Sequence, residues 1–209
     1  MLNTWKKSAK AALAFVAAAC MAPHTLAGNA QAGAKINSNC IGCHGIPGYK
    51  TAFPVVHTVP KISGQNPAYI EAALKAYRSG DRSHPSMVGI AKTLTDQNKA
   101  DLAAYYSGKG SEKHTPATVK GGNVAAGKQK ADAVCAACHG ADGIKSIDPS
   151  YPILAGQYPD YLARALTEYQ KGTRKNAIMA GMAAALTKQE IADVAAYYAS
   201  LPSPLNSNK

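Results

Sequence analysis

The sequence predicts an all-α protein made of two helical domains in tandem. Residues 60–107 recur as residues 152–199 without a gap, and 22 of the 48 aligned positions are identical. Each copy places apolar residues at helical spacing, and neither shows the alternation expected of strands. Each copy also follows a Cys-x-x-Cys-His sequence. A period of about 92 residues is too long for a solenoid, so the two copies are separate domains.

The chain begins with the features of a cleaved export signal, which we place at residues 1–27. Three lysines precede an apolar run of about 11 residues, and small residues follow. That run is too short for a retained membrane span, which needs about 20 residues. Cleavage after Ala27 is preferred to cleavage after Ala32, because residues 28–30 then resemble residues 122–124 ahead of the second copy. The mature chain is therefore expected to be exported.

Attachment sites for a c-type haem are predicted at two pentapeptides, Cys40-Ile41-Gly42-Cys43-His44 and Cys135-Ala136-Ala137-Cys138-His139. Two thiols add to the vinyl groups of the porphyrin, and the histidine supplies an imidazole to the iron. A lone Cys-x-x-Cys also suits a redox dithiol or half a zinc site. The histidine after the second cysteine, repeated about 95 residues later, disfavours both. We therefore predict two covalently attached haem c groups, held by Cys40, Cys43, Cys135 and Cys138, with His44 and His139 as iron ligands.

The fifth cysteine, Cys20, lies in the export signal. Lipidation at Cys20 is an alternative to simple cleavage, although Ala17 stands where a bacterial lipobox usually has a larger aliphatic residue. Cleavage after Ala27 removes Cys20 and leaves no free thiol beyond those of the haem motifs. Disulfides, cysteine nucleophiles and cysteine iron ligands are then excluded together.

The net charge of +11 falls to +8 once the three lysines of the signal are removed. Ionised haem propionates reduce it further. The chain has no arginine-rich helix and no aromatic residues interleaved with basic ones, so nucleic acid is not an expected partner. A modest basic surface instead suits electrostatic steering toward an acidic docking patch on a redox partner.

Three helices are predicted in each copy. The second begins with a proline and ends before Gly80 or Gly172, and Thr95 or Thr187 is the N-cap of the third. The predicted helices span residues 32–39, 67–79 and 95–107 in the first copy and residues 125–134, 159–171 and 187–201 in the second. A unit this small buries too little apolar surface on its own, so we expect a haem to complete each core.

The boundary between the copies is placed in a segment of Gly, Ser, Lys, Thr and Pro without apolar periodicity. This gives a first domain at residues 28–107, a linker at residues 108–121 and a second domain at residues 122–209. Between the haem motif and the repeat, the first copy carries three extra residues around positions 46–59.

The sixth ligand of each iron is predicted to be a methionine, Met87 in the first copy and Met179 in the second. They occupy equivalent positions about 40 residues beyond the motif histidines, in segments expected to wrap across the distal haem face. A thioether favours ferrous iron and raises the potential. The alternative is a methionine that fills a gap in the core, but recurrence in both copies favours the ligand.

Other candidates for the sixth ligand do not recur. Met182 corresponds to Ile90, and His84 corresponds to Asn176. His57 and His114 have no counterpart in the other copy, so we expect both at the surface.

Supporting roles are predicted for two further recurring pairs. A ligating histidine needs an acceptor for its other ring nitrogen, often a backbone carbonyl, and Pro60 and Pro152 are candidates to supply it. Rigidity of the turn is the alternative role for these prolines. Arg82 and Arg174 are candidate partners of the haem propionates, with a simple exposed cation as the alternative.

These motifs together resemble the dihaem cytochromes c of the c4 type. The resemblance rests on two Cys-x-x-Cys-His motifs, each followed by Pro-x-x-x-Gly-Gln, a single Met and a Leu-Thr…Asp-x-Ala-Ala-Tyr-Tyr segment, and it covers nearly the whole mature chain. Only residues 46–50 depart from the pattern. The resemblance implies two class I cytochrome c domains, His/Met coordination of both irons, and propionate edges that face each other across the domain interface.

The resemblance also implies a periplasmic electron carrier rather than an enzyme. Its expected partners are redox proteins, namely a quinol-oxidising complex or dehydrogenase as donor and a membrane terminal oxidase as acceptor, with peripheral membrane association as a further expectation. The alternative is a dedicated cytochrome subunit of a periplasmic dehydrogenase. A dihaem redox enzyme is a weaker alternative, because it needs an open iron position or a cysteine ligand.

Overall fold

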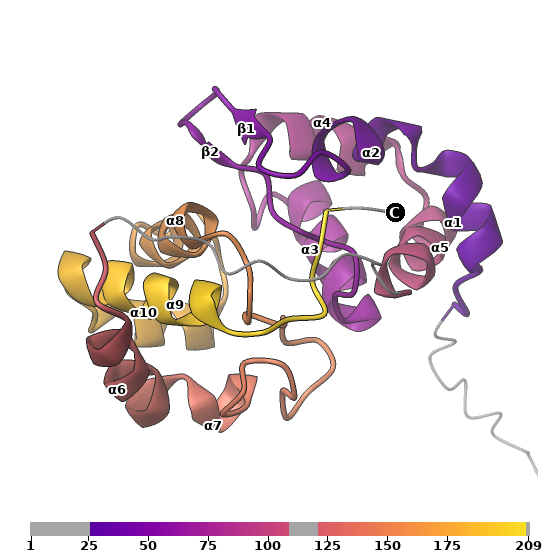
Figure 1. The fold of residues 1–209 in the computed structure, drawn as a ribbon. Helices are drawn as coiled ribbons and strands as arrows, with labels where there is room; N and C mark the ends of the chain where they lie inside the picture. Colours follow the sequence, from indigo (N-terminus) through magenta and orange to yellow (C-terminus); the bar gives the residue numbers. More distant parts are fainter. Residues whose placement is uncertain (1–25, 109–120, 208–209) are drawn as a thin grey trace, which may run out of the picture.

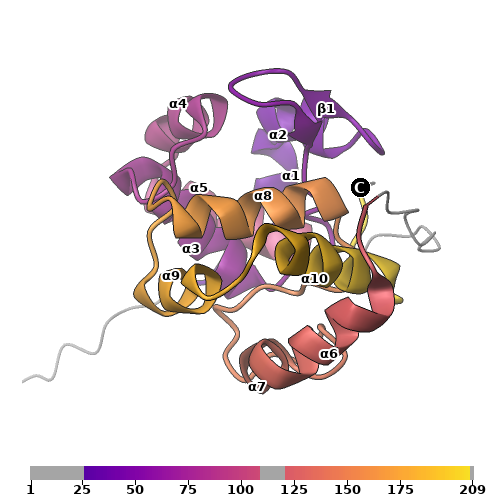
Figure 2. The same ribbon diagram turned by 90° about the vertical axis from the view of Figure 1, so that its left-hand side faces the viewer.

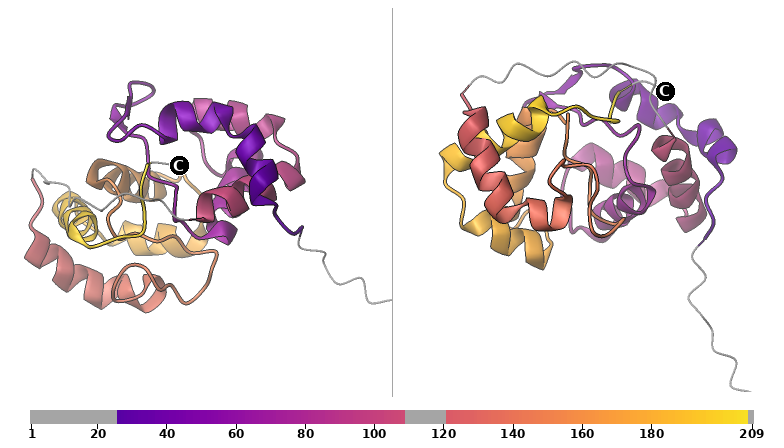
Figure 3. Two further views of the ribbon diagram at one scale, coloured as in Figure 1. Left: turned by 45° about the vertical axis from the view of Figure 1, so that its right-hand side comes forward. Right: turned by 60° about the horizontal axis from the view of Figure 1, so that its bottom comes forward.

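The computed structural model describes residues 26–108 and 121–207. The predicted signal and linker, with Cys20 and His114, therefore lie largely outside the described residues. The described elements are α1 (Ala30–Ile36), α2 (Ser38–His44), β1 (Lys50–Thr51), β2 (His57–Thr58), α3 (Pro67–Ser79), α4 (Pro85–Thr93), α5 (Asp96–Ser107), α6 (Val124–Val134), α7 (Ala136–His139), α8 (Pro159–Gln170), α9 (Ala177–Ala184) and α10 (Lys188–Ser200). They form two mainly helical domains that lie side by side (Figures 1 and 3). The predicted fold class is confirmed.

The first and last helices of each domain cross at a glycine. A Cβ atom on Gly33 of α1 would overlap the carbonyl oxygen of Asp101 in α5, and one on Gly127 of α6 would overlap that of Asp193 in α10. Each aspartate also accepts a hydrogen bond of 2.7 Å from the backbone N–H of the opposite helix's N-cap asparagine. The sequence thus builds the same close helix crossing twice.

The middle helix of each domain, α3 in the first and α8 in the second, completes the domain's core. Ile70 and Leu74 of α3 pack with Leu102 and Tyr106 of α5, and α8 packs on α10 in the same way. The α3 helix occupies the predicted residues exactly, and Thr95 and Thr187 form the predicted N-caps within complete capping boxes. These sequence signals were sufficient to predict the helix boundaries because each one depends only on neighbouring residues.

The segments that carry the two methionines fold as short helices. They are α4 and α9, where the sequence predicted only a wrapping segment. Pro85 starts α4, whereas the side chain of Asn176 accepts a hydrogen bond from the N–H of Met179 at the start of α9. Figure 2 shows both helices at the same end of the molecule, beside α3 and α8.

A small hairpin in the first domain was not predicted. β1 and β2 pair antiparallel, with Lys50 opposite Thr58 and Thr51 opposite His57. Strands of two residues are too short to show alternation, and they lie where the first copy has its extra residues. The expectation that His57 is a surface residue is wrong: its side chain is only 6% exposed, because β2 folds against α8.

The two domains meet through contacts that occur in equivalent pairs. Gln65 accepts from the N–H of Ile153 and donates to its carbonyl, at 2.8 and 3.0 Å. Gln157 makes the same two bonds to Lys61, at 2.9 Å each. Arg82 and Arg174 face each other in an antiparallel bridge. The interface therefore has an approximate two-fold axis, as an isologous dimer does. Among the described residues, no helix is long and apolar enough to cross a membrane.

Candidate haem sites

One continuous cavity runs through both domains, and its empty volume, including the open mouth, is about 1990 Å³. Most of the predicted attachment and ligand residues line it. They are Cys40, Cys43, His44 and Met87 from the first domain and Cys135, His139 and Met179 from the second. Cys138 is not among the lining residues. None of these four cysteines is in a disulfide, so their sulfurs are free to form thioethers.

The motif histidines come from helices that end at the cavity. His44 is the last residue of α2, and its Nδ1 lies 2.8 Å from the carbonyl oxygen of Pro60. His139 ends α7, with its Nδ1 3.2 Å from the carbonyl oxygen of Pro152. A carbonyl only accepts, so each Nδ1 carries the proton and each Nε2 keeps its lone pair.

Burial in the cavity lowers the pKa of both imidazoles and so favours their neutral form. Burial lowers the pKa of His44 and outweighs the hydrogen bond to Pro60, which acts in the opposite direction. Burial likewise lowers the pKa of His139 against its bond to Pro152. A neutral ring with a free Nε2 is the form that binds a metal.

The structure separates the competing methionines. Met87 on α4 and Met179 on α9 both line the cavity, whereas Met182 is 44% exposed and does not line it. Ile90, the counterpart of Met182, is a lining residue. In the first domain His84 also lines the cavity, and its buried Nδ1 has no hydrogen-bond partner.

The two arginines are buried in the interface, so the exposed-cation alternative is wrong for both. Arg82 stacks on Tyr77 and donates to the hydroxyl of Tyr161 in the other domain at 3.0 Å. Arg174 makes the equivalent contacts with the ring of Tyr169 and the hydroxyl of Tyr69, the latter at 2.9 Å.

These buried cations also perturb the tyrosines beside them. Burial opposes ionisation of Tyr69, but the positive charges of Arg174 and Arg82 outweigh it and lower the pKa of Tyr69 to about 8. The Nε of Arg174 is buried without a hydrogen-bond partner. The interface thus places excess positive charge and one unused donor at the cavity wall, as a carboxylate ligand requires.

Four residues of this interface could be recognised from the sequence only as identities between the two copies, which gave them no role. They are Gln65, Gln157, Tyr69 and Tyr161. Their partners are backbone or side-chain atoms of the other domain, 79 to 105 positions away. Recurrence was the available signal, but it does not say whether a residue faces its own core or the other copy.

The cavity fits two haem groups. Apolar side chains form most of its wall, including Ile70, Leu74, Leu162 and Val194. It presents neutral imidazoles, thioethers and cysteine sulfurs for the iron and the porphyrin edge, and buried guanidinium groups for propionates. This fold and donor set define a dihaem c-type cytochrome.

The comparisons with known proteins agree. The chain belongs to the cytochrome c family, and within it to the dihaem c4 type: the family model "Cytochrome c" matches residues 30–107 and again residues 124–202. Cytochrome c4 of Pseudomonas aeruginosa is 32% identical, covering 82% of this chain and 88% of that protein. The chain therefore carries two covalently bound haem c groups.

Two further relatives extend the comparison. A solved cytochrome c4 structure from Acidithiobacillus ferrooxidans has a TM-score of 0.69 and 32% identity, and covers 79% of this chain and 100% of that one. A thiosulfate dehydrogenase electron acceptor from Stutzerimonas stutzeri is 31% identical, covering 78% of each chain.

Proposed function

We propose that this protein is a periplasmic electron carrier that passes single electrons through two haems. Its donor is a quinol-oxidising complex or a dehydrogenase, and its acceptor is a terminal oxidase. The observation that carries the proposal is the recurrence, at one cavity, of a histidine held by a proline carbonyl and a methionine on a short helix.

The residues suit electron transfer rather than catalysis. When bound, haem supplies an iron that changes oxidation state by one electron. His44 and His139 are held in one ring orientation by Pro60 and Pro152 and would bind the irons together with Met87 and Met179. A histidine and a methionine held by the protein would limit geometric change at the iron and exclude substrate. In this proposal no acid, base or nucleophile is required.

Arg82 and Arg174 have the role of propionate partners in this proposal. Both are buried and positively charged, and the unused Nε of Arg174 supplies a donor. Because each arginine also contacts the other domain, it links the two haem sites electrostatically. Reduction of either haem then takes place beside the same pair of cations.

The axial ligands are tested by absorption spectroscopy of the oxidised protein. We expect the weak near-infrared sulfur-to-iron band with the intensity of two haems, and loss of half of it in Met87→Ala and half in Met179→Ala. Met182→Ala is the control and should keep the full band. An unchanged band in a ligand variant would refute that ligand. High-spin iron in the unaltered protein would instead favour a redox enzyme.

A dedicated subunit of a dehydrogenase is the second candidate. It is favoured by the similarity to the Stutzerimonas stutzeri protein named as a thiosulfate dehydrogenase electron acceptor. Purification from the native host distinguishes the two. A carrier elutes alone, whereas a subunit elutes with stoichiometric dehydrogenase activity.

Export with cleavage after Ala27 belongs to the same proposal. The mass of the mature protein checks the cleavage site. Trp5 is the single tryptophan of the chain. Tryptophan emission from the purified protein would therefore show a retained signal.

A further inference from the structure

The β1–β2 hairpin ends in an exposed apolar surface, which we call the hairpin tip and define as Phe53, Val55 and Val56. Their side chains are 68%, 58% and 64% exposed. None of the three lines the haem cavity, so a bound haem leaves them uncovered. Figure 1 shows the hairpin projecting beyond the helices. Large apolar side chains exposed together mark an interaction site.

Hydrogen bonds to the backbone of the hairpin hold the tip in place. The Nδ1 of His57 donates to the carbonyl of Val55 at 2.8 Å, and Arg164 of α8 approaches the same carbonyl at 3.4 Å. At the base of the hairpin, the N–H of Val59 donates to the carbonyl of Tyr49 at 2.8 Å. A surface fixed in this way loses little conformational entropy when a partner binds.

The second domain has a different surface at the corresponding place. Residues 140–151 include Asp142 and Asp148, both exposed and turned onto their own loop backbone. In the first domain residues 36–70 contain no carboxylate, and Lys50 is exposed beside the tip. The first domain therefore contributes no carboxylate of its own to this region, and the carboxylate of Asp160 from α8 lies at the base of the hairpin, where the N–H and hydroxyl of Thr58 donate to it.

The tip is also continuous with the wall of the first haem site. The chain on either side of the tip supplies Tyr49, Thr51 and His57 to the cavity, and the haem motif ends at His44 just before it. A protein seated on the tip would therefore lie beside the haem of the first domain. A tip inserted in lipid would turn that haem toward the bilayer instead of toward a redox centre.

We propose that the hairpin tip is the docking surface for the electron acceptor, a redox partner protein with an apolar patch and an acidic rim. Electrons then leave through the haem of the first domain. This proposal rests on the function proposed above. The acidic rim is inferred from charge complementarity with Lys50 and with the positive net charge of the chain.

The test measures oxidation of the reduced dihaem protein by a terminal oxidase purified from the host membranes. In Phe53→Ser/Val55→Ser/Val56→Ser we expect the KM to rise about tenfold, as when a small apolar anchor is removed, with kcat within about twofold. Lys50→Glu should also raise the KM at low salt. Ile147→Ser, at a 72% exposed isoleucine of the second domain, is the matched control. Phe53→Ser alone serves if the triple variant does not fold.

The possible outcomes distinguish failure of the docking surface from failure of the proposed electron-carrier function. An unchanged KM in folded tip variants with an intact sulfur-to-iron band overturns the docking surface and leaves the carrier function. Failure of the oxidase to oxidise the unaltered protein overturns both. Binding to phosphatidylcholine–phosphatidylglycerol vesicles that the tip variants lose would assign the tip to lipid. A dimer in sedimentation that the variants abolish would assign it to a second copy.

Discussion

Arg174 combines three properties that rarely occur together in one side chain. It is buried, it stacks on Tyr169, and its Nε has no hydrogen-bond partner. Burial of an unused donor costs about 1–3 kcal/mol, so such a group normally has a partner that completes it. A haem propionate would be that partner, and the charge of Arg174 would then act on the iron.

Replacement of Arg174 by Gln should lower the potentials of both haems, by roughly tens of millivolts. A nearby positive charge favours the reduced iron, and a propionate without its cation leaves uncompensated negative charge. Spectroelectrochemical titration measures the shift. Arg78→Gln is the control, because Arg78 pairs at the surface with Asp96 and should leave both potentials unchanged. Unchanged potentials in the Arg174 variant would contradict the assignment.

At the scale of elements, different side chains hold the two methionine helices. In the first domain Lys99, fully buried, donates to the carbonyl of Leu94 at 2.9 Å just beyond α4, and its charge is paired with Asp96. In the second domain Gln170 donates to the carbonyls of Ala183 and Leu186, at 2.7 Å each. Both arrangements tie the C-terminal end of the methionine helix to its domain.

Gln170→Leu should weaken the proposed bond between Met179 and iron without changing the proposed bond of Met87. Two carbonyls lose their donor, at a cost of about 2 kcal/mol, and α9 becomes freer to move away. On addition of urea, half of the sulfur-to-iron band should disappear at a lower urea concentration than in the unaltered protein. Lys99→Met should do the same for the other half.

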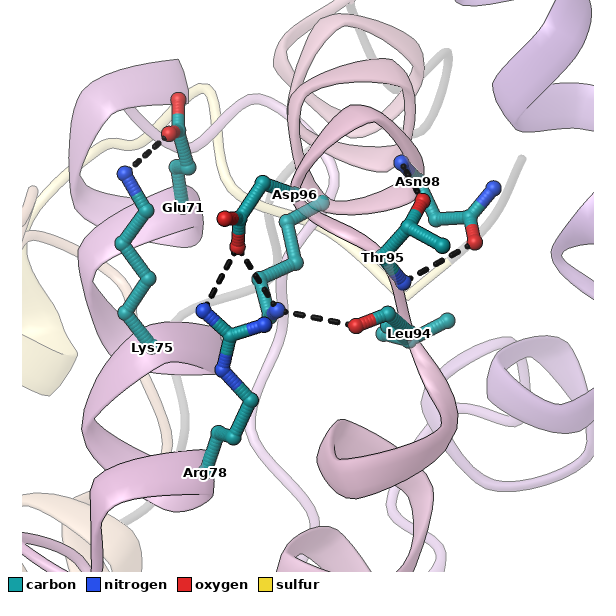
Figure 4. A network of polar contacts seen from close by, with 8 residues as sticks. Glu71, Lys75, Arg78, Leu94, Thr95, Asp96 and Asn98 are labelled. Carbon is teal, nitrogen blue, oxygen red and sulfur yellow. Dashed lines mark hydrogen bonds and ion pairs between the residues drawn. The ribbon is translucent and has the colours of Figure 1, made fainter.

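The control for these variants is Lys75→Met. Lys75 forms an exposed ion pair with Glu71 on α3, a contact worth at most about 1 kcal/mol (Figure 4). Loss of both halves of the band together, or of neither, would show that Lys99 and Gln170 do not position the methionines.

Many of the helix boundaries were predictable from sequence, because caps and helix starts are local signals. Pro67, Thr95 and Thr187 placed helix starts correctly. The hairpin and the burial of His57 were not predictable, since strands of two residues carry no periodicity and His57 is buried by a helix of the other domain. The haem residues were recognisable because attachment chemistry fixes their spacing, which holds whatever the surrounding fold.

The whole molecule depends on an interface made of paired contacts. The four bonds of Gln65 and Gln157 are made to backbone groups of the other domain. The sequence could not reveal them, because a backbone partner, whether an N–H or a carbonyl, leaves no residue signature. Together with the crossed arginine–tyrosine contacts, they fix one domain against the other and join both haem sites in one cavity.

Gln65→Leu/Gln157→Leu should loosen the domains and slow electron transfer between the haems. Six backbone groups lose their partners, four in the other domain and the N–H groups of Asn66 and Tyr158 beside the glutamines. At about 1 kcal/mol for each group, the free energy of unfolding should fall by several kcal/mol. Pulse radiolysis measures the rate between haems, and denaturant titration the stability. Gln189→Leu, which removes bonds to Gly121 and Asp193 and none to the first domain, is the control. An unchanged rate between haems would show that these bonds do not govern the coupling.

The two-fold pairing of interface contacts also has a historical meaning. A single domain with this glutamine, arginine and tyrosine would meet its own copy through the same bonds, each made twice. The present chain therefore has the form of a homodimer whose subunits were joined by duplication and fusion. Fusion removed the need for the halves to remain identical. The hairpin in one half, and the carboxylates in the matching loop of the other, are changes that an ancestor of two identical subunits could not have made separately.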